Sequence, residues 1–123
     1  MNKLILVVAG GGIGSGARYL VALGSARLFG PAFPWGTFAV NVLGSLLLGL
    51  ILGWAASDPE GSEKVRLALG TGVMGGFTTY SSFNAETLRM IESGTYGMAA
   101  GYAGMTFVVC LAAGAAGLWL GRV

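Results

Sequence analysis

The chain has 123 residues, of which 54% are hydrophobic and only 10% are charged, and it contains 23 glycines and no histidine. A soluble domain carries roughly 25% charged residues because its surface faces water, so this composition excludes an ordinary soluble protein. Three runs without charge, residues 28–57, 67–85 and 93–121, indicate membrane spans, since a hydrocarbon core of about 30 Å needs about 20 apolar residues. A secretory signal peptide would supply only one short apolar run at the N-terminus.

The charges and the cysteine exclude several function classes. The net charge of +2 is the balance of seven lysines and arginines against five acidic residues. The basic residues are scattered, whereas a nucleic-acid partner would need a basic cluster. Cys110 is the one cysteine and lies in an apolar run, which rules out a disulfide framework and a cysteine zinc site. Without histidine the chain lacks the usual general base and the commonest metal ligand, so we do not expect an enzyme.

Helix breaks and charges together predict an all-α integral membrane protein, one domain over residues 1–123 with four helices at about 4–29, 35–56, 65–92 and 95–121. The first helix ends where Pro31 and Pro34 cannot continue it. Trp35 and Trp54 lie about 28 Å apart along the second helix at 1.5 Å per residue, as expected for indoles at the two membrane interfaces. The polar stretch 57–64 is expected to be a turn in water. An even number of spans places both termini on one side.

The basic residues show almost no bias between the two sides of the membrane. Those on the side of the termini are Lys3, Lys64, Arg66 and Arg122. Arg27 and Arg89 are on the other side, with Arg18 inside the first span toward that side. Because the Lys/Arg bias sets orientation, such a chain could insert both ways up, and we expect an antiparallel homodimer of dual topology. A weakly biased monomer is the alternative.

Glycines at four-residue spacing predict close helix packing, because small residues let membrane helices approach each other. The pairs are Gly10 and Gly14, Gly49 and Gly53, Gly72 and Gly76, Gly97 and Gly101, and Gly117 and Gly121. A Gly-x-Gly-x-x-Ala match at Gly12, Gly14 and Ala17 is similar to a dinucleotide fingerprint, but the next acidic residue is Asp58 and no strand pattern follows. A nucleotide site is therefore not expected.

Arg18 is a charge within the first predicted span, where arginine is costly and marks a site or pathway by default. The alternative is that its side chain extends to the membrane interface. A small four-helix exporter of cations would need a carboxylate in this span. The positive charge argues against that function.

Polar side chains follow one face of two other spans. In the second span these are Thr37, Asn41 and Ser45, and in the fourth they are Tyr102, Thr106 and Cys110. The Asn41 amide could bridge helices or offer donors to an ion. The polar face of the fourth span is as consistent with packing between helices as with an ion pathway.

The third predicted span is unusually polar over residues 71–84. Paired glycines followed by the paired threonines Thr78 and Thr79 weaken a helix, so we expect a break in mid-span. Non-helical backbone at that depth needs protein or a water-filled cavity to satisfy its carbonyls. Carbonyls freed in this way could coordinate a cation.

Three segments together strongly resemble the Fluc/CrcB family of fluoride channels, and the resemblance covers essentially the whole chain. They are GGFTTYSSFNAET at 75–87, GTFAVNVLG at 36–44 and GSGARY at 14–19. The resemblance implies an antiparallel homodimer of dual topology with two fluoride pores. It also implies passive fluoride export across the cytoplasmic (inner) membrane, which gives resistance to fluoride.

Site residues also follow from this resemblance. A structural Na⁺ on the dyad would be held by the backbone carbonyls of Gly75 and Thr78. The pore aromatics would be Tyr80 and Phe83, and many members have phenylalanine at the first of these positions. Their positive ring edges would face the anion. Beside them the resemblance places Asn41 and the hydroxyls of Ser81 and Ser82.

Fluoride is small and strongly hydrated, so a pore must replace its water with many donors. Beyond the residues implied by the family, the hydroxyls of Thr37, Tyr102 and Thr106 and the guanidinium of Arg18 are candidate donors. Two other functions remain open at this point. A small dual-topology transporter of another substrate is the first, and a purely structural or assembly membrane protein is the second. The polar third span argues against the latter.

Overall fold

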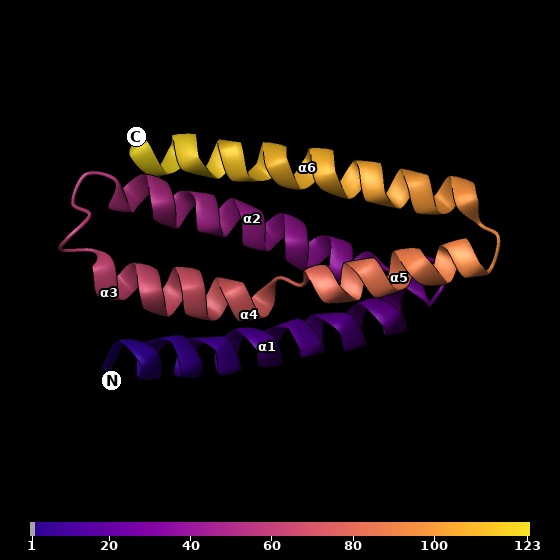
Figure 1. The fold of residues 1–123 in the computed structure, drawn as a ribbon, viewed down its shortest axis with the longest axis horizontal. Coiled ribbons are helices and arrows are strands. Elements are labelled where there is room, and N and C mark those ends of the chain that lie inside the picture. The colour runs from indigo at the N-terminus through magenta and orange to yellow at the C-terminus, as the bar shows by residue number, and fades with distance from the viewer. Residues whose placement is uncertain (1) are drawn as a thin grey trace.

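The computed structural model describes residues 2–123, and all of its regular elements are helical (Figure 1). Its elements in chain order are α1 (Asn2–Phe29), α2 (Trp35–Ala55), α3 (Glu63–Val65), the π-helix η1 (Arg66–Met74), α4 (Gly75–Phe77), α5 (Tyr80–Glu92) and α6 (Tyr96–Arg122). By length and hydropathy α1, α2 and α6 are each able to cross a membrane. The chain is therefore a multi-pass membrane protein, and its N- and C-termini lie at the same end of the molecule.

The expected break in the third span is confirmed, and it falls at Thr78 and Thr79. Before it, α3, η1 and α4 follow one another without a gap from Glu63 to Phe77. Thr78 then turns to ψ 157° and Thr79 to φ −151°, both extended conformations. The Thr79 hydroxyl accepts a hydrogen bond from the backbone N–H of Ser82 at 3.1 Å and so caps the start of α5.

Two glycines with positive φ reverse the chain at the end opposite the termini. Gly30, with φ 76°, ends α1 before the two prolines, and Gly94, with φ 81°, separates α5 from α6. At the second turn the N–H of Thr95 donates to the Met90 carbonyl at 2.9 Å and the N–H of Gly94 donates to the Ile91 carbonyl at 3.1 Å. This pattern is a Schellman motif, which needs the left-handed conformation that glycine adopts without strain.

Four of the five glycine pairs bring backbones together. A Cβ on Gly14 would meet the backbone of Val73 and Phe77, and a Cβ on Gly117 would meet the carbonyl of Leu46. In this way Gly10, Gly14, Gly72 and Gly76 join α1 to η1 and α4, while Gly49, Gly53, Gly117 and Gly121 join α2 to α6. The expectation was wrong for Gly97 and Gly101 within one chain, since both face open space on α6.

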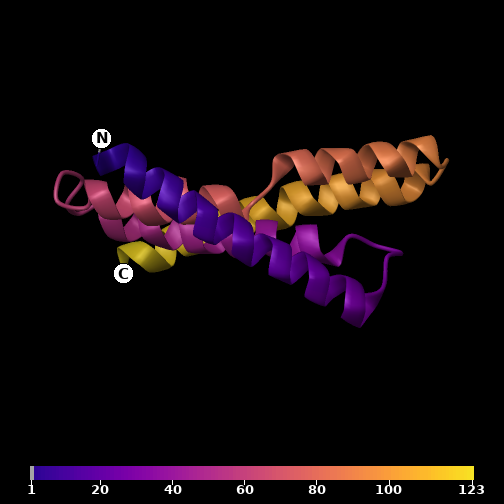
Figure 2. The ribbon, with the colours of Figure 1, turned by 90° about the horizontal axis from the view of Figure 1, so that it is seen from below.

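The other end of the molecule is less tightly joined. Figure 2 shows α5 and the beginning of α6 side by side, diverging from α1 and the α1–α2 connection. A cluster of Met90, Ala99 and Tyr102 holds α5 to α6, and Phe33, Phe38 and Phe83 pack against it. This divergence leaves room for one of the two cavities described below, the one lined by the α1–α2 connection and α5.

We expect Gly14→Ala to lower the free energy of unfolding by about 1–3 kcal/mol, because the added methyl group forces α1 away from η1 and α4. Gly12→Ala is the matched control, since a Cβ there meets nothing within 4 Å. Denaturant unfolding of both variants in detergent micelles measures the difference. Equal stability of the two variants would contradict the packing described here.

Candidate functional site

Asn41 holds the break in the third span from the neighbouring helix α2. Its Oδ1 accepts a hydrogen bond from the Thr79 N–H at 2.8 Å, and its Nδ2 donates to the Thr79 carbonyl at 3.1 Å. One side-chain amide therefore satisfies both backbone polar groups of one extended residue, Thr79. Of the two uses that the sequence left open for Asn41, the structure has the helix-bridging one.

Arg18 also binds the backbone at the break. Its Nε donates to the Gly76 carbonyl at 3.0 Å, and the side chain is half-buried. A cation at this position offsets the partial negative charge of the carbonyls at the C-terminal end of α4. The guanidinium therefore stabilises the broken helix rather than reaching the membrane interface.

Among the carbonyls before and within the break, those of Gly75 and Thr78 lose the N–H groups that would pair with them in a helix. In an uninterrupted helix the Gly75 carbonyl would pair with the Thr79 N–H, which instead donates to Asn41. The Thr78 carbonyl would pair with the Ser82 N–H, which instead donates to the Thr79 hydroxyl. Both carbonyl oxygens are hard ligands of the kind that a small cation binds. By contrast, no group of three His, Cys, Asp or Glu side chains able to hold a metal occurs within residues 2–123.

Aromatic rings follow the break along α5. The ring of Phe83 contacts Tyr80 at a centroid distance of 5.8 Å and Tyr102 at 5.0 Å. Tyr102 in turn meets Phe33 edge-on at 5.2 Å. Tyr102 is almost fully buried, whereas 77% of Tyr80 is exposed in the single chain. Phe83 thus links an exposed ring to the buried aromatic cluster.

Glu86 binds the hydroxyls of Thr37 and Tyr102, two of the expected pathway residues, although no role was predicted for Glu86 itself. Thr37 donates to its Oε2 at 2.9 Å and Tyr102 donates to its Oε1 at 3.0 Å. Glu86 comes three residues after Phe83, so the two share a face of α5. That spacing, together with an acidic residue directly after the uncharged run, is the signal that could have identified it.

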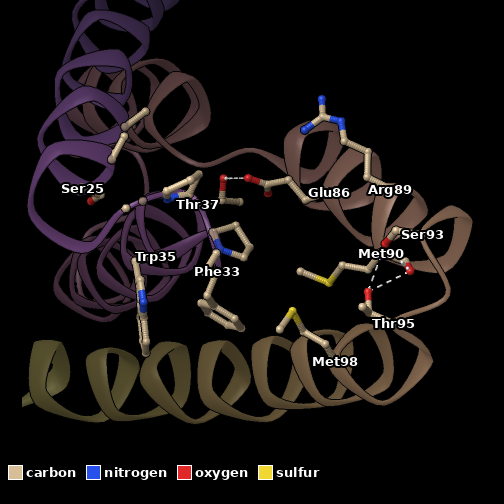
Figure 3. A pocket seen from close by; sticks show the side chains of 17 residues that line it. Ser25, Phe33, Trp35, Thr37, Glu86, Arg89, Met90, Ser93, Thr95 and Met98 are labelled. Carbon is tan, nitrogen blue, oxygen red and sulfur yellow. Dashed lines mark hydrogen bonds between the residues drawn. The ribbon is translucent and has the colours of Figure 1, made fainter.

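Two cavities lie on either side of the aromatic residues. The first, here called the outer cavity, has a volume of about 530 Å³ and opens where α5 diverges from α1. Figure 3 shows it with Thr37 bonded to Glu86 and with Arg89 at its edge. The second, here called the break cavity, has about 890 Å³ and lies between α2, the break and α6.

The structure distributes the expected pathway residues unevenly. Thr37 lines the outer cavity. Asn41, Tyr80, Phe83 and Thr106 line the break cavity. Of the remaining pathway residues that the structure describes, Tyr102, Arg18, Ser81 and Ser82 line neither cavity. The Ser81 hydroxyl lies 3.2 Å from that of Thr79, within hydrogen-bonding distance.

Known proteins resemble the chain over nearly its whole length. The family model described as CrcB-like protein, Camphor Resistance (CrcB), matches residues 5–118. The chain is 50% identical over 123 residues to the Fluoride-specific ion channel FluC of Caulobacter vibrioides (strain NA1000 / CB15N), covering 99% of this chain and 97% of the relative. A protein of the same name from Agrobacterium fabrum is 50% identical over 122 residues, covering 99% and 98%. That from Novosphingobium aromaticivorans is 47% identical, covering 98% and 94%.

We expect Asn41→Ala to destabilise the fold by about 2–3 kcal/mol, since it removes two hydrogen bonds of about 1 kcal/mol each and leaves the Thr79 peptide unsatisfied. Asn84→Ala is the control, because Asn84 is exposed on α5. Unfolding in detergent gives the free energies, and amide hydrogen exchange at Thr79 reports the break itself. Unchanged exchange at Thr79 in Asn41→Ala would refute the bridging role.

Proposed function

The chain belongs to the CrcB family, and we propose that it is a fluoride-selective channel that lets fluoride leave the cell passively and so gives resistance to fluoride. The observation that carries the proposal is 50% identity over 99% of the chain to a protein named Fluoride-specific ion channel FluC. The donors and ring edges around the break support it on chemical grounds. A channel of this kind is not an enzyme.

The proposed pore runs past the aromatic residues that separate the two cavities. Phe83 and Tyr80 line the break cavity, and in this proposal their ring edges, which carry the positive rim of the aromatic quadrupole, face the anion. Thr106 adds a hydroxyl on the opposite wall. Weak donors of this kind replace the water of a small anion without trapping it. The fixed charge of Arg18 is bound to the Gly76 carbonyl, which supports a pore without a positive trap.

Tyr102 and Thr37 continue the donor path toward the outer cavity. Both hydroxyls donate to Glu86, so the carboxylate fixes their orientation. Ser81 and Ser82 stand beside this path as further hydroxyls at the start of α5. Each hydroxyl has one proton and donates it to Glu86, so in this proposal an anion takes the place of a carboxylate oxygen as the acceptor, and the two hydrogen bonds partly offset the charge of Glu86.

The functional unit in this proposal is an antiparallel homodimer of dual topology in the inner membrane. Each copy is a single domain, residues 1–123, with four transmembrane helices, the third being the broken rod. Tyr80 supports pairing, since an exposed ring beside polar threonines at mid-span suits a protein contact better than lipid. The balanced basic residues support insertion in both orientations. Two such copies would form two pores.

A structural Na⁺ completes the proposal. The carbonyls of Gly75 and Thr78 fit such an ion, because the N–H groups that would pair with them in a helix donate elsewhere. Four carbonyls, two from each copy, would meet at the dyad. When bound, the ion supplies positive charge that holds the two breaks together.

The purified protein in liposomes should release trapped fluoride, measured with a fluoride electrode, and should retain chloride under the same conditions. Equal release of both anions would contradict a fluoride-selective channel. Release of neither would indicate the assembly role or another substrate.

Phe83→Ile should lower the fluoride flux by about tenfold or more, equivalent to about 1.4 kcal/mol in the barrier, because it removes the ring edge and keeps apolar bulk. Tyr80→Phe removes only a hydroxyl and separates two roles of that residue. Flux close to that of the parent would assign the role to the ring, and a large loss would assign it to the oxygen. The pore assignment is wrong if Phe83→Ile conducts like the parent.

Gly75→Val should weaken the dimer and abolish its dependence on Na⁺ while leaving the single chain folded. The reason is that Gly75 is exposed and has an ordinary helical φ of −61°, and a Cβ there would meet only the Gly70 carbonyl at 3.9 Å, an ordinary contact, so a clash would come from the partner. Thr78→Ala is the control, as it keeps the backbone carbonyl. Light scattering with Na⁺ or N-methylglucamine measures the dimer fraction. A parent dimer indifferent to Na⁺ would rule out the site.

A further inference from the structure

Cys110 forms part of the wall of the break cavity. It lies on α6, is partly buried and shares the cavity with Asn41, Tyr80 and Phe83. Ser45 of α2 lines the same cavity. The one thiol of the chain therefore faces the space through which the proposed function routes fluoride.

Thr106 supplies a second, independent observation at this wall. It precedes Cys110 by four residues, one turn along the same face of α6. Only 7% of Thr106 is exposed, and its hydroxyl has no hydrogen-bond partner among residues 2–123. A buried hydroxyl without a partner costs free energy, and a ligand with an acceptor atom would recover part of it. The wall thus offers a free thiol and a hydroxyl without a partner, one helical turn apart on α6.

We propose that the break cavity is a modification site for small, neutral, soft electrophiles, which react at the Cys110 sulfur and thereby block permeation. With an alkyl thiosulfonate, the sulfur of Cys110 attacks the sulfenyl sulfur of the reagent. A new S–S bond forms, the S–SO₂ bond breaks, sulfinate leaves with the electron pair, and the thiol proton passes to the buffer. The Thr106 hydroxyl can donate to a sulfonyl oxygen as the negative charge grows there.

The lining of the cavity sets the class of reagent. Besides the polar residues already named, the wall consists mainly of aliphatic side chains and glycines: Leu48, Gly49, Leu52, Ala103, Leu111, Gly114, Ala115 and Leu118. An organic cation would lose its water there without an opposite charge to replace it. A volume of about 890 Å³ admits a small neutral molecule. We therefore expect the neutral methyl reagent to react faster than its trimethylammonium-ethyl analogue.

Block of permeation rests on the proposed channel function, whereas labelling of Cys110 does not. The experiment therefore measures labelling and fluoride flux separately. The parent protein in liposomes is treated with methyl methanethiosulfonate. Intact mass then counts methylthio groups per chain, and the fluoride electrode records flux relative to the same vesicles without reagent. We expect one group per chain and loss of most of the flux, both reversed by a reducing thiol. Labelling with the trimethylammonium-ethyl reagent should be slower.

Two variants separate block from labelling. Cys110→Ser should gain no methylthio group and keep its own untreated flux in the presence of reagent. Val108→Cys in the Cys110→Ser background places a thiol at a 62% exposed position of α6 that does not line the break cavity. This double variant should be labelled without loss of flux.

Three results would overturn the inference. They are no labelling of Cys110 in the membrane, labelling without loss of flux, and faster reaction of the cationic reagent. If the untreated parent does not conduct fluoride, the proposed channel function fails and block with it, while the mass measurement still decides whether the cavity wall reacts as described.

Discussion

Two hydrogen bonds between the Asn41 amide and the backbone of Thr79 allow the helical run from Glu63 to Glu92 to break at residues 78 and 79. In hydrocarbon an unpaired peptide group costs several kcal/mol, and water is not there to bind it. Asn41 binds the backbone N–H and carbonyl of Thr79, Arg18 binds the carbonyl of Gly76, and the Thr79 hydroxyl caps the start of α5. Because the N–H groups of Thr79 and Ser82 donate to side chains, the carbonyls of Gly75 and Thr78 lack their helical partners. The rings of Tyr80 and Phe83 come next along the chain, at the start of α5.

The break can have this geometry because glycine lets α1 lie against the backbone of η1 and α4. Arg18 is on α1 and reaches Gly76 only at that close approach. On the other side, α2 carries Asn41 and is held to α6 through backbone contacts at Gly49 and Gly117. The many glycines and the break are thus connected. Close packing of α1 and α2 against their neighbours positions Arg18 and Asn41, which bind the backbone groups at the break.

Local patterns were enough to predict the three long apolar helices, the turn prolines and the break, because hydropathy, φ restrictions and β-branched pairs act over a few residues. Contacts between distant residues were beyond such patterns. Glu86 lies 49 residues from Thr37, and nothing in the local sequence states that the two hydroxyls of Thr37 and Tyr102 meet one carboxylate. The π-helix η1 was also missed, since its i→i+5 bonding follows from the fit against α1 rather than from propensity. For Arg18 the cost of a charge within a span was predictable from its position, whereas its partner, the Gly76 carbonyl, is known only from the fold.

The uneven distribution of glycine contacts has a mechanical consequence. Backbone-to-backbone packing makes the half of the molecule near the termini stiff, since atoms there have almost no space in which to shift. The hairpin of α5 and the beginning of α6 is closed by its own Schellman turn and its aromatic cluster, and it departs from α1 (Figure 2). Because α6 is one unbroken helix from Tyr96 to Arg122, the hairpin can change its angle to α1 only by turning at residues 78 and 79 together with bending of α6, and that angle sets the width of the outer cavity.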